Sequence, residues 1–148
     1  MTLQETIDND LREALRARDD IKVSTLRMLK AAFNNIQIDK RKDKLDDAEV
    51  IDAIAKDIKK HRDSIESFQK GNRQDLVEKE QKELAVLEGY MPPQLSQEEI
   101  IAIVKEAIAD TGASSKADMG KVMKLVMEKT RGRADGKLVS ETVSSQLK

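Results

Sequence analysis

The only two prolines of this 148-residue chain are adjacent, at positions 92 and 93. A proline pair cannot continue a helix, because proline lacks a backbone N–H and its ring clashes with the preceding turn, and it favours a stiff extended segment. The 91 residues before the pair and the 55 after it are free of proline. We therefore predict an all-α protein with a helical domain over residues 1–90, a linker over 91–95 and a second helical domain over 96–148.

Apolar residues at helical spacing predict four antiparallel helices in the first domain. Thr2 and Glu5 show the pattern of a capping box, and a second helix is expected from residue 19 or 20. The third helix should stop at Gly71–Asn72, where glycine can take the left-handed conformation, and the fourth should run to residue 90. The residues expected on the apolar stripes are Leu3, Ile7, Leu11, Leu15, Ile21, Leu26, Leu29, Phe33, Ile36, Val50, Ile51, Ile54, Ile58, Ile65, Phe68, Leu76, Val77, Leu84, Val86 and Leu87.

The segment 39–47, between the second and third helices, is charged at every position except Leu45. It has no apolar periodicity, which is typical of a solvated connection. We therefore predict an exposed loop there.

The second domain is predicted to be a small three-helix bundle. Ser96 and Glu99 form another capping-box pattern, with Leu95 placed for a hydrophobic staple against Ile100. Helices are expected over 97–111, about 118–130 and about 137–147, and a core this small is marginal alone. Its expected members are Ile101, Val104, Ile108, Val122, Met123, Val126, Val139, Val143 and Leu147.

Composition excludes several functional classes. Aromatic residues make up 2% of the chain, so bases of a single strand cannot stack on a row of rings. The chain has no cysteine, which removes thiol catalysis and cysteine-bound zinc. No run approaches the roughly 20 apolar residues that span a bilayer, and no leader pattern opens the chain. We expect a cytoplasmic protein that does not enter a membrane.

Few residues suggest catalytic chemistry. His61 is the only histidine, and a metal site would need carboxylates from elsewhere in the fold to join it. Helical spacing alone explains its position, so a structural or surface role is favoured. The acidic pairs at 19–20, 46–47 and 98–99 all stand at expected helix starts, where the helix dipole favours negative charge. No phosphate-binding glycine loop or nucleophile elbow occurs. We predict no catalytic residue, no metal site and no cofactor.

A basic stretch in the second domain is more informative. Residues 113–137 carry seven basic side chains against three acidic ones, a net charge of +4 in a chain whose total is -1. Arginine suits phosphate, and the glycines at 132 and 136 allow a close backbone approach, although Asp135 is expected to cap the last helix. The lysines on the third helix, at positions 56, 59 and 60, are interpreted as a solvated face. The RNA-contact candidates are Lys121, Lys124, Arg131, Arg133 and Lys137.

Five segments resemble the YqeY family: Thr25–Ala32, Ile65–Arg73, Glu83–Ser96, Asp118–Met123 and Gly132–Gly136. That family is similar to the C-terminal region of GatB, one of the subunits of the tRNA-dependent aspartyl/glutamyl amidotransferase. The resemblance implies an all-helical fold with a small C-terminal bundle. In that enzyme the chemistry belongs to another subunit and to the catalytic core of GatB, whereas the GatB tail contacts the tRNA body. The resemblance thus implies contact with tRNA and no catalytic residues.

Three functions remain open at this point. The preferred hypothesis is a non-catalytic module that binds tRNA or another structured RNA, which shape and phosphate contacts can recognise without aromatic residues. The second is an accessory component of glutamine-dependent amide transfer to tRNA, a carbon–nitrogen ligase activity. The third is a protein–protein adaptor, with translation-related proteins as conceivable partners.

Overall fold

A computed structural model describes residues 1–147 of the chain. In this part every regular element is a helix and no strand occurs, which confirms the all-α prediction. The chain divides into two compact units, Met1–Met91 and Pro92–Lys148. Each unit has its own cluster of buried apolar side chains.

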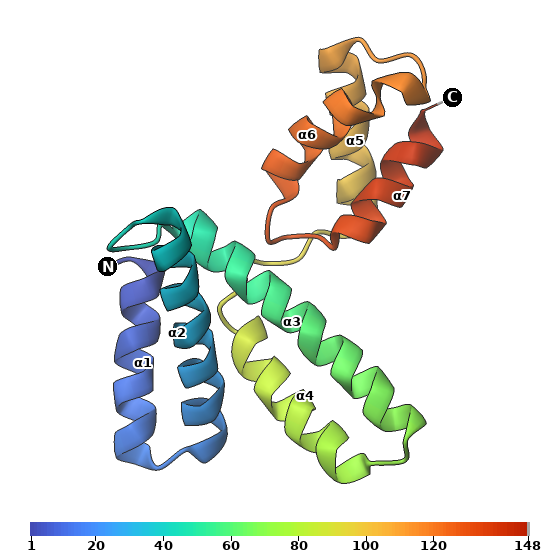
Figure 1. Cartoon of the computed structure of the whole chain (residues 1–148). Helices are drawn as coiled ribbons and strands as arrows, with labels where there is room; N and C mark the ends of the chain where they lie inside the picture. The colour runs from blue at the N-terminus through green and yellow to red at the C-terminus, as the bar shows by residue number, and fades with distance from the viewer. Residues whose placement is uncertain (148) are drawn as a thin grey trace. The chain divides into compact units, whose positions relative to one another are not determined.

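The first unit consists of two antiparallel helix pairs (Figure 1). Helix α2 of the first pair contacts both helices of the second, so the two pairs share one core. The four helices are α1 (Leu3–Ala17), α2 (Asp20–Lys40), α3 (Asp47–Lys70) and α4 (Gln74–Glu88). The buried core residues are Ile7, Leu11, Leu26, Leu29, Phe33, Leu45, Val50, Ala53, Ile54, Ile58 and Leu87.

Side-chain caps define where α1, α2 and α3 begin. The capping box of Thr2 and Glu5 is present with both of its hydrogen bonds, as predicted. Asp46 and Glu49 form a second box at the start of α3. Asp19 caps α2 through the backbone N–H of Lys22. The acidic residues at these helix starts therefore satisfy free amides, as the dipole argument predicts.

The structure corrects the apolar stripe of α1. Leu15 is 45% exposed, whereas Ala14 is buried in its place. A spacing of four residues advances the direction of the side chain by about 40° per step relative to a helix of 3.6 residues per turn. By Leu15 the drift from Leu3 reaches about 120°, which turns the side chain away from the core.

The end of α3 also differs from the prediction. Gly71 has a φ of -85°, and Asn72 takes the left-handed conformation instead, with a φ of 55°. Asparagine tolerates this region better than most residues because its short side chain can bond locally. The helix therefore ends at the predicted place, after Lys70, but the left-handed residue is Asn72 rather than Gly71.

The charged segment between α2 and α3 is not wholly exposed. Leu45 is only 3% exposed and belongs to the core of the first unit. Its backbone N–H donates a hydrogen bond to Gln4 Oε1, 2.9 Å away, and Gln4 Nε2 bonds Gln37. The prediction of a solvated loop is right for the charged neighbours of Leu45 and wrong for Leu45 itself.

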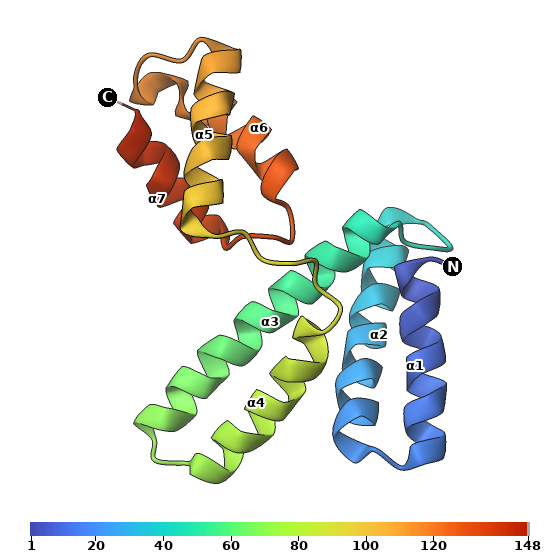
Figure 2. The ribbon, with the colours of Figure 1, turned by 180° about the vertical axis from the view of Figure 1, so that it is seen from behind.

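The second unit is a three-helix bundle in which each of the three α-helices contacts the other two (Figure 2). Its elements are α5 (Gln97–Thr111), the short 3-10 helix η1 (Lys116–Asp118), α6 (Met119–Thr130) and α7 (Gly136–Gln146). The buried core residues are Ile100, Val104, Ala107, Val122, Val126, Val139, Val143 and Leu147.

The inward face of α5 is rotated by one residue from the predicted face. Ile100 and Ala107 are fully buried beside Val104, whereas Ile101 and Ile108 are only half-buried. The continuous run of apolar residues in α5 allows either face to point inward, so the sequence pattern does not choose between them. Packing against α6 and α7 makes the choice.

The capping box of Ser96 and Glu99 is present and offers a test of helix capping in this unit. We expect Ser96→Ala to lower the free energy of unfolding by about 1 kcal/mol, because Oγ caps a free amide of α5. Ser115 precedes η1 without a side-chain cap bond, so Ser115→Ala is the matched control. Chemical denaturation followed by circular dichroism should show a loss for Ser96→Ala alone; equal losses would contradict the capping role.

Candidate functional site

The structure places the five RNA-contact candidates on two consecutive elements of the second unit and on the turn between them. Lys121 and Lys124 lie on α6, three residues apart and therefore on neighbouring positions of one face. Arg131 and Arg133 lie in the turn after α6, and Lys137 is in the first turn of α7. All five side chains are exposed.

The turn that carries the two arginines is held by the segment around the prolines. Gly132 has a φ of 73°, a conformation that glycine adopts without strain. Its carbonyl accepts a hydrogen bond from Gln94 Nε2 at 3.0 Å, and the carbonyl of Arg133 accepts one from the backbone N–H of Leu95 at 2.7 Å. Residues 94 and 95, expected to be a linker, therefore support the arginine turn.

The acidic residues of the basic stretch are largely occupied by backbone amides. Asp118 accepts a hydrogen bond from the N–H of Ser114, and Asp135 caps α7 through the N–H of Lys137, as predicted. These bonds hold two of the three carboxylates against backbone amides, and neither forms an ion pair within residues 1–147.

Lys129, in the same stretch, has an anionic partner outside it. Lys129 pairs with Glu106 on α5, with 3.7 Å between Nζ and Oε1. Among residues 1–147, Lys121, Lys124, Arg133 and Lys137 form no ion pair. Four of the five candidates thus offer their charge to solvent or to an external anion.

The candidates do not converge on one point. A helix rises 1.5 Å per residue, so Lys121 lies roughly 15 Å along the axis from the start of the arginine turn. Such spacing does not build a pocket for a small anion. It suits a polyanion, whose charges are spread over a similar length.

The histidine is buried between two carboxylates. His61 on α3 has its Nδ1 3.3 Å from Glu80 Oε2 and its Nε2 3.5 Å from Glu83 Oε2, both on α4. Burial and the neighbouring charge of Glu80 raise the pKa of Glu83 above its ordinary value. The sequence pattern did not single out Glu80 or Glu83. The available signal was that both carboxylates fall within the apolar stripe of α4 between Val77 and Leu87.

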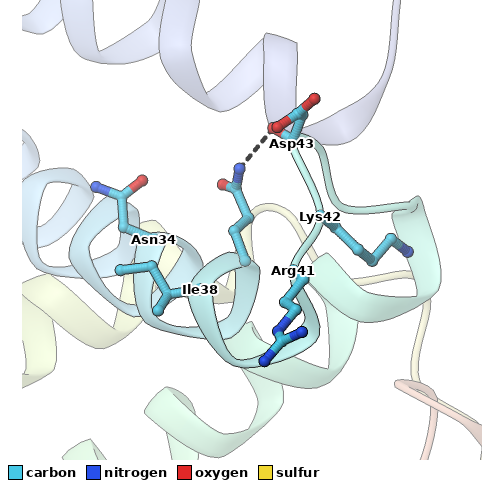
Figure 3. A pocket seen from close by; sticks show the side chains of 6 residues that line it. Asn34, Ile38, Arg41, Lys42 and Asp43 are labelled. Carbon is cyan, nitrogen blue, oxygen red and sulfur yellow. Dashed lines mark hydrogen bonds between the residues drawn. The ribbon is translucent and has the colours of Figure 1, made fainter.

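A shallow pocket opens where α2 ends and the charged loop begins (Figure 3). Its lining is polar apart from Ile38, and Gln37 Nε2 donates a hydrogen bond to the carbonyl of Asp43 across it. The labelled side chains of Arg41 and Lys42 point in different directions rather than toward a common centre. We assign no ligand to this pocket.

Three further polar contacts stabilise the first unit. Tyr90 donates a hydrogen bond to Asp10 Oδ2 at 2.5 Å, and burial together with this bond raises the pKa of the phenol. Glu49 bonds both Lys40 and Lys42, and these two bonds lower the pKa of Glu49 to about 2. These contacts join the end of α4 to α1, and α3 to the end of α2.

Comparison with known proteins identifies the family. A family model described as "Yqey-like protein" matches residues 4–147, nearly the whole chain. The chain belongs to the YqeY family. This confirms the resemblance stated from the sequence motifs.

Similar proteins are fungal members named "Altered inheritance of mitochondria protein 41, mitochondrial". The chain is 37% identical to the protein of Kluyveromyces lactis over 70% of this chain and 57% of that protein. It is 40% identical to the protein of Eremothecium gossypii over 65% of this chain and 54% of that protein. It is 36% identical to the protein of Pyrenophora tritici-repentis over 90% of this chain and 75% of that protein. The chain thus spans less than two thirds of the length of the first two relatives.

The names of the fungal relatives place those proteins in mitochondria. In residues 1–147, no helix combines the length and apolar character needed to cross a membrane. The cytoplasmic location expected from the sequence stays a prediction.

Proposed function

We propose that this YqeY-family protein is a non-catalytic module that binds tRNA or another structured RNA through the second unit. The observation that carries the proposal is the set of five exposed lysine and arginine side chains on α6, the following turn and α7. Four of them form no ion pair within the described chain. Basic side chains that neutralise backbone phosphates supply the sequence-independent part of nucleic-acid affinity.

The composition supports structured RNA over a single strand. The aromatic residues are Phe33, Phe68 and Tyr90, and all three belong to the first unit. The second unit therefore has no ring on which a base could stack. Helical RNA is recognised through phosphates, 2′-hydroxyls and shape, which basic side chains spread along a surface can contact.

The similarity of the family to the GatB tail supports tRNA as the specific RNA. Both the cytoplasm and the mitochondria named for the fungal relatives contain tRNA. The amide-transfer alternative is the less favoured one, because no nucleophile paired with its base is found among residues 1–147.

The proposal is tested by the salt dependence of binding to unfractionated tRNA. Each lost phosphate contact reduces the slope of log affinity against log salt by about one. We expect the double substitution Arg131→Ala with Arg133→Ala to weaken binding at low salt and to make that slope shallower by about two. Fluorescence anisotropy over a series of salt concentrations provides the measurement.

The matched control is Lys59→Ala with Lys60→Ala, which removes the same charge from exposed positions on α3. We expect this pair to leave both affinity and slope nearly unchanged. Equal losses from both pairs would show non-specific attraction and contradict the proposed surface. If the wild-type protein does not bind tRNA at low salt, the RNA proposal fails and the adaptor function takes its place.

A further inference from the structure

The cluster around His61 contains three potential metal ligands from two helices. His61 comes from α3, whereas Glu80 and Glu83 come from α4 and are three residues apart, which places them on neighbouring positions of one face. The two helices run side by side in both views (Figures 1 and 2). One ligand atom from each residue lies within 4.8 Å of the others.

Hydrogen bonding leaves this cluster unsatisfied. Glu80 Oε2 is buried and accepts no hydrogen bond, although it lies 3.3 Å from Nδ1 of His61. Within residues 1–147 it is the one buried side-chain nitrogen or oxygen in that condition. A buried polar atom without a partner is costly, and a bound ion is one of the ways in which native proteins satisfy such an atom.

The charge of the cluster is also unbalanced. Two carboxyl groups face one imidazole ring, so the cluster has more acidic than basic groups. Asp57, one turn before His61, adds negative charge near Glu83, and Lys79 offsets part of it. Buried charges require compensation by a partner or a metal ion, and a dication would supply it here.

We propose that His61, Glu80 and Glu83 bind one divalent transition-metal ion of the zinc class between α3 and α4. Zinc–ligand distances are about 2.0–2.2 Å for histidine nitrogen and carboxylate oxygen, so tetrahedral ligand atoms lie roughly 3.3–3.6 Å apart. The two close contacts of His61 involve different ring nitrogens, Nδ1 toward Glu80 and Nε2 toward Glu83, and one ion binds only one of them. One ligand atom from each of the three residues lies within 4.8 Å of the others, and a bound ion would draw them together from that spacing.

The ligand set selects the class of ion. An imidazole nitrogen suits zinc, copper, iron and nickel, whereas magnesium and calcium prefer oxygen ligands. The side chain of Glu80 is 19% exposed and gives solvent access, so water can complete the coordination. The site belongs to the first unit and is independent of the RNA-contact candidates, all of which belong to the second.

The experiment uses the full chain without a histidine tag, freed of metal by a chelator and titrated with zinc chloride. His61 is the only histidine, so the ring resonances in a two-dimensional ¹H–¹⁵N spectrum need no assignment. We expect saturable binding of one zinc ion per chain, a shift of these ring resonances and a higher melting temperature. Magnesium chloride should leave the ring resonances unchanged.

Variants test the ligands one at a time. Loss of a residue that only hydrogen-bonds a metal ligand weakens metal affinity by about 10- to 100-fold. Glu83→Gln and His61→Asn alter the ligands themselves, so each should weaken zinc binding at least about a hundredfold. Glu80→Gln alters the most exposed ligand and keeps its shape, so it should retain the fold and still weaken binding. Glu78→Gln, an exposed position on the same helix, is the matched control and should bind as the wild type does.

Two results would overturn the proposal. One is the absence of saturable zinc binding to the wild-type chain at millimolar concentration, with unmoved ring resonances. The other is equal zinc affinity in Glu80→Gln and Glu78→Gln, which would place any bound ion elsewhere. In either case the cluster is a polar contact that joins α3 to α4 and holds no ion.

Discussion

Phe33→Ala is expected to lower the free energy of unfolding of the first unit by about 3–5 kcal/mol. Phe33 is 1% exposed and is the largest fully buried side chain among residues 1–147. Its truncation removes apolar burial and leaves a cavity in a core that all four helices share. Because small domains are stable by only about 5–15 kcal/mol, this loss is a large fraction of the total.

Tyrosine fluorescence isolates this effect. Tyr90 is the only tyrosine, the chain has no tryptophan, and the ring packs against the core of the first unit. The unfolding transition reported by Tyr90 fluorescence should shift to a lower denaturant concentration in Phe33→Ala. The control is Met28→Ala on the same helix, where the side chain is 64% exposed and the change should stay within about 0.5 kcal/mol. Equal shifts in the two variants would contradict the assignment of Phe33 to the core.

Leu45→Ala is expected to cost about 2–5 kcal/mol, although it lies in a segment that is otherwise entirely charged. The sequence pattern predicts an exposed position, where a substitution changes stability by no more than about 0.5 kcal/mol. The structure instead buries this side chain against the core. The same fluorescence measurement therefore decides between the sequence pattern and the tertiary structure.

Lys44→Ala provides the control for Leu45→Ala, since it is exposed and adjacent in the same segment. We expect its unfolding transition to match that of the wild type. A small effect of Leu45→Ala, equal to that of Lys44→Ala, would mean that the segment is solvated as the sequence pattern predicts and that its leucine does not join the core.

Local signals in the sequence predicted most of the helices. Capping boxes at Thr2 and Ser96 depend on residues three apart, so the sequence alone shows where they can form. The same holds for Asp135 at the start of α7. The motifs that resemble the YqeY family also identified the family correctly.

The candidate RNA surface could be predicted only in part. The excess of basic residues is visible in the sequence, and all five candidates are exposed. The sequence did not show that Lys129 is paired with Glu106, or that Gln94 and Leu95 hold the arginine turn. These facts depend on which helices pack together, and they decide which charges remain available to an external partner.

What the sequence by itself determined is the helical character of the chain and where most helices begin and end, because those properties depend on neighbours within one turn. Tertiary structure decided which face of α5 points inward, since Ile100 and Ile101 satisfy the local pattern almost equally well. It also buried Leu45 and brought Glu80 and Glu83 to His61. Contacts between separate helices form only when whole apolar faces pack, and no spacing within a single helix encodes them.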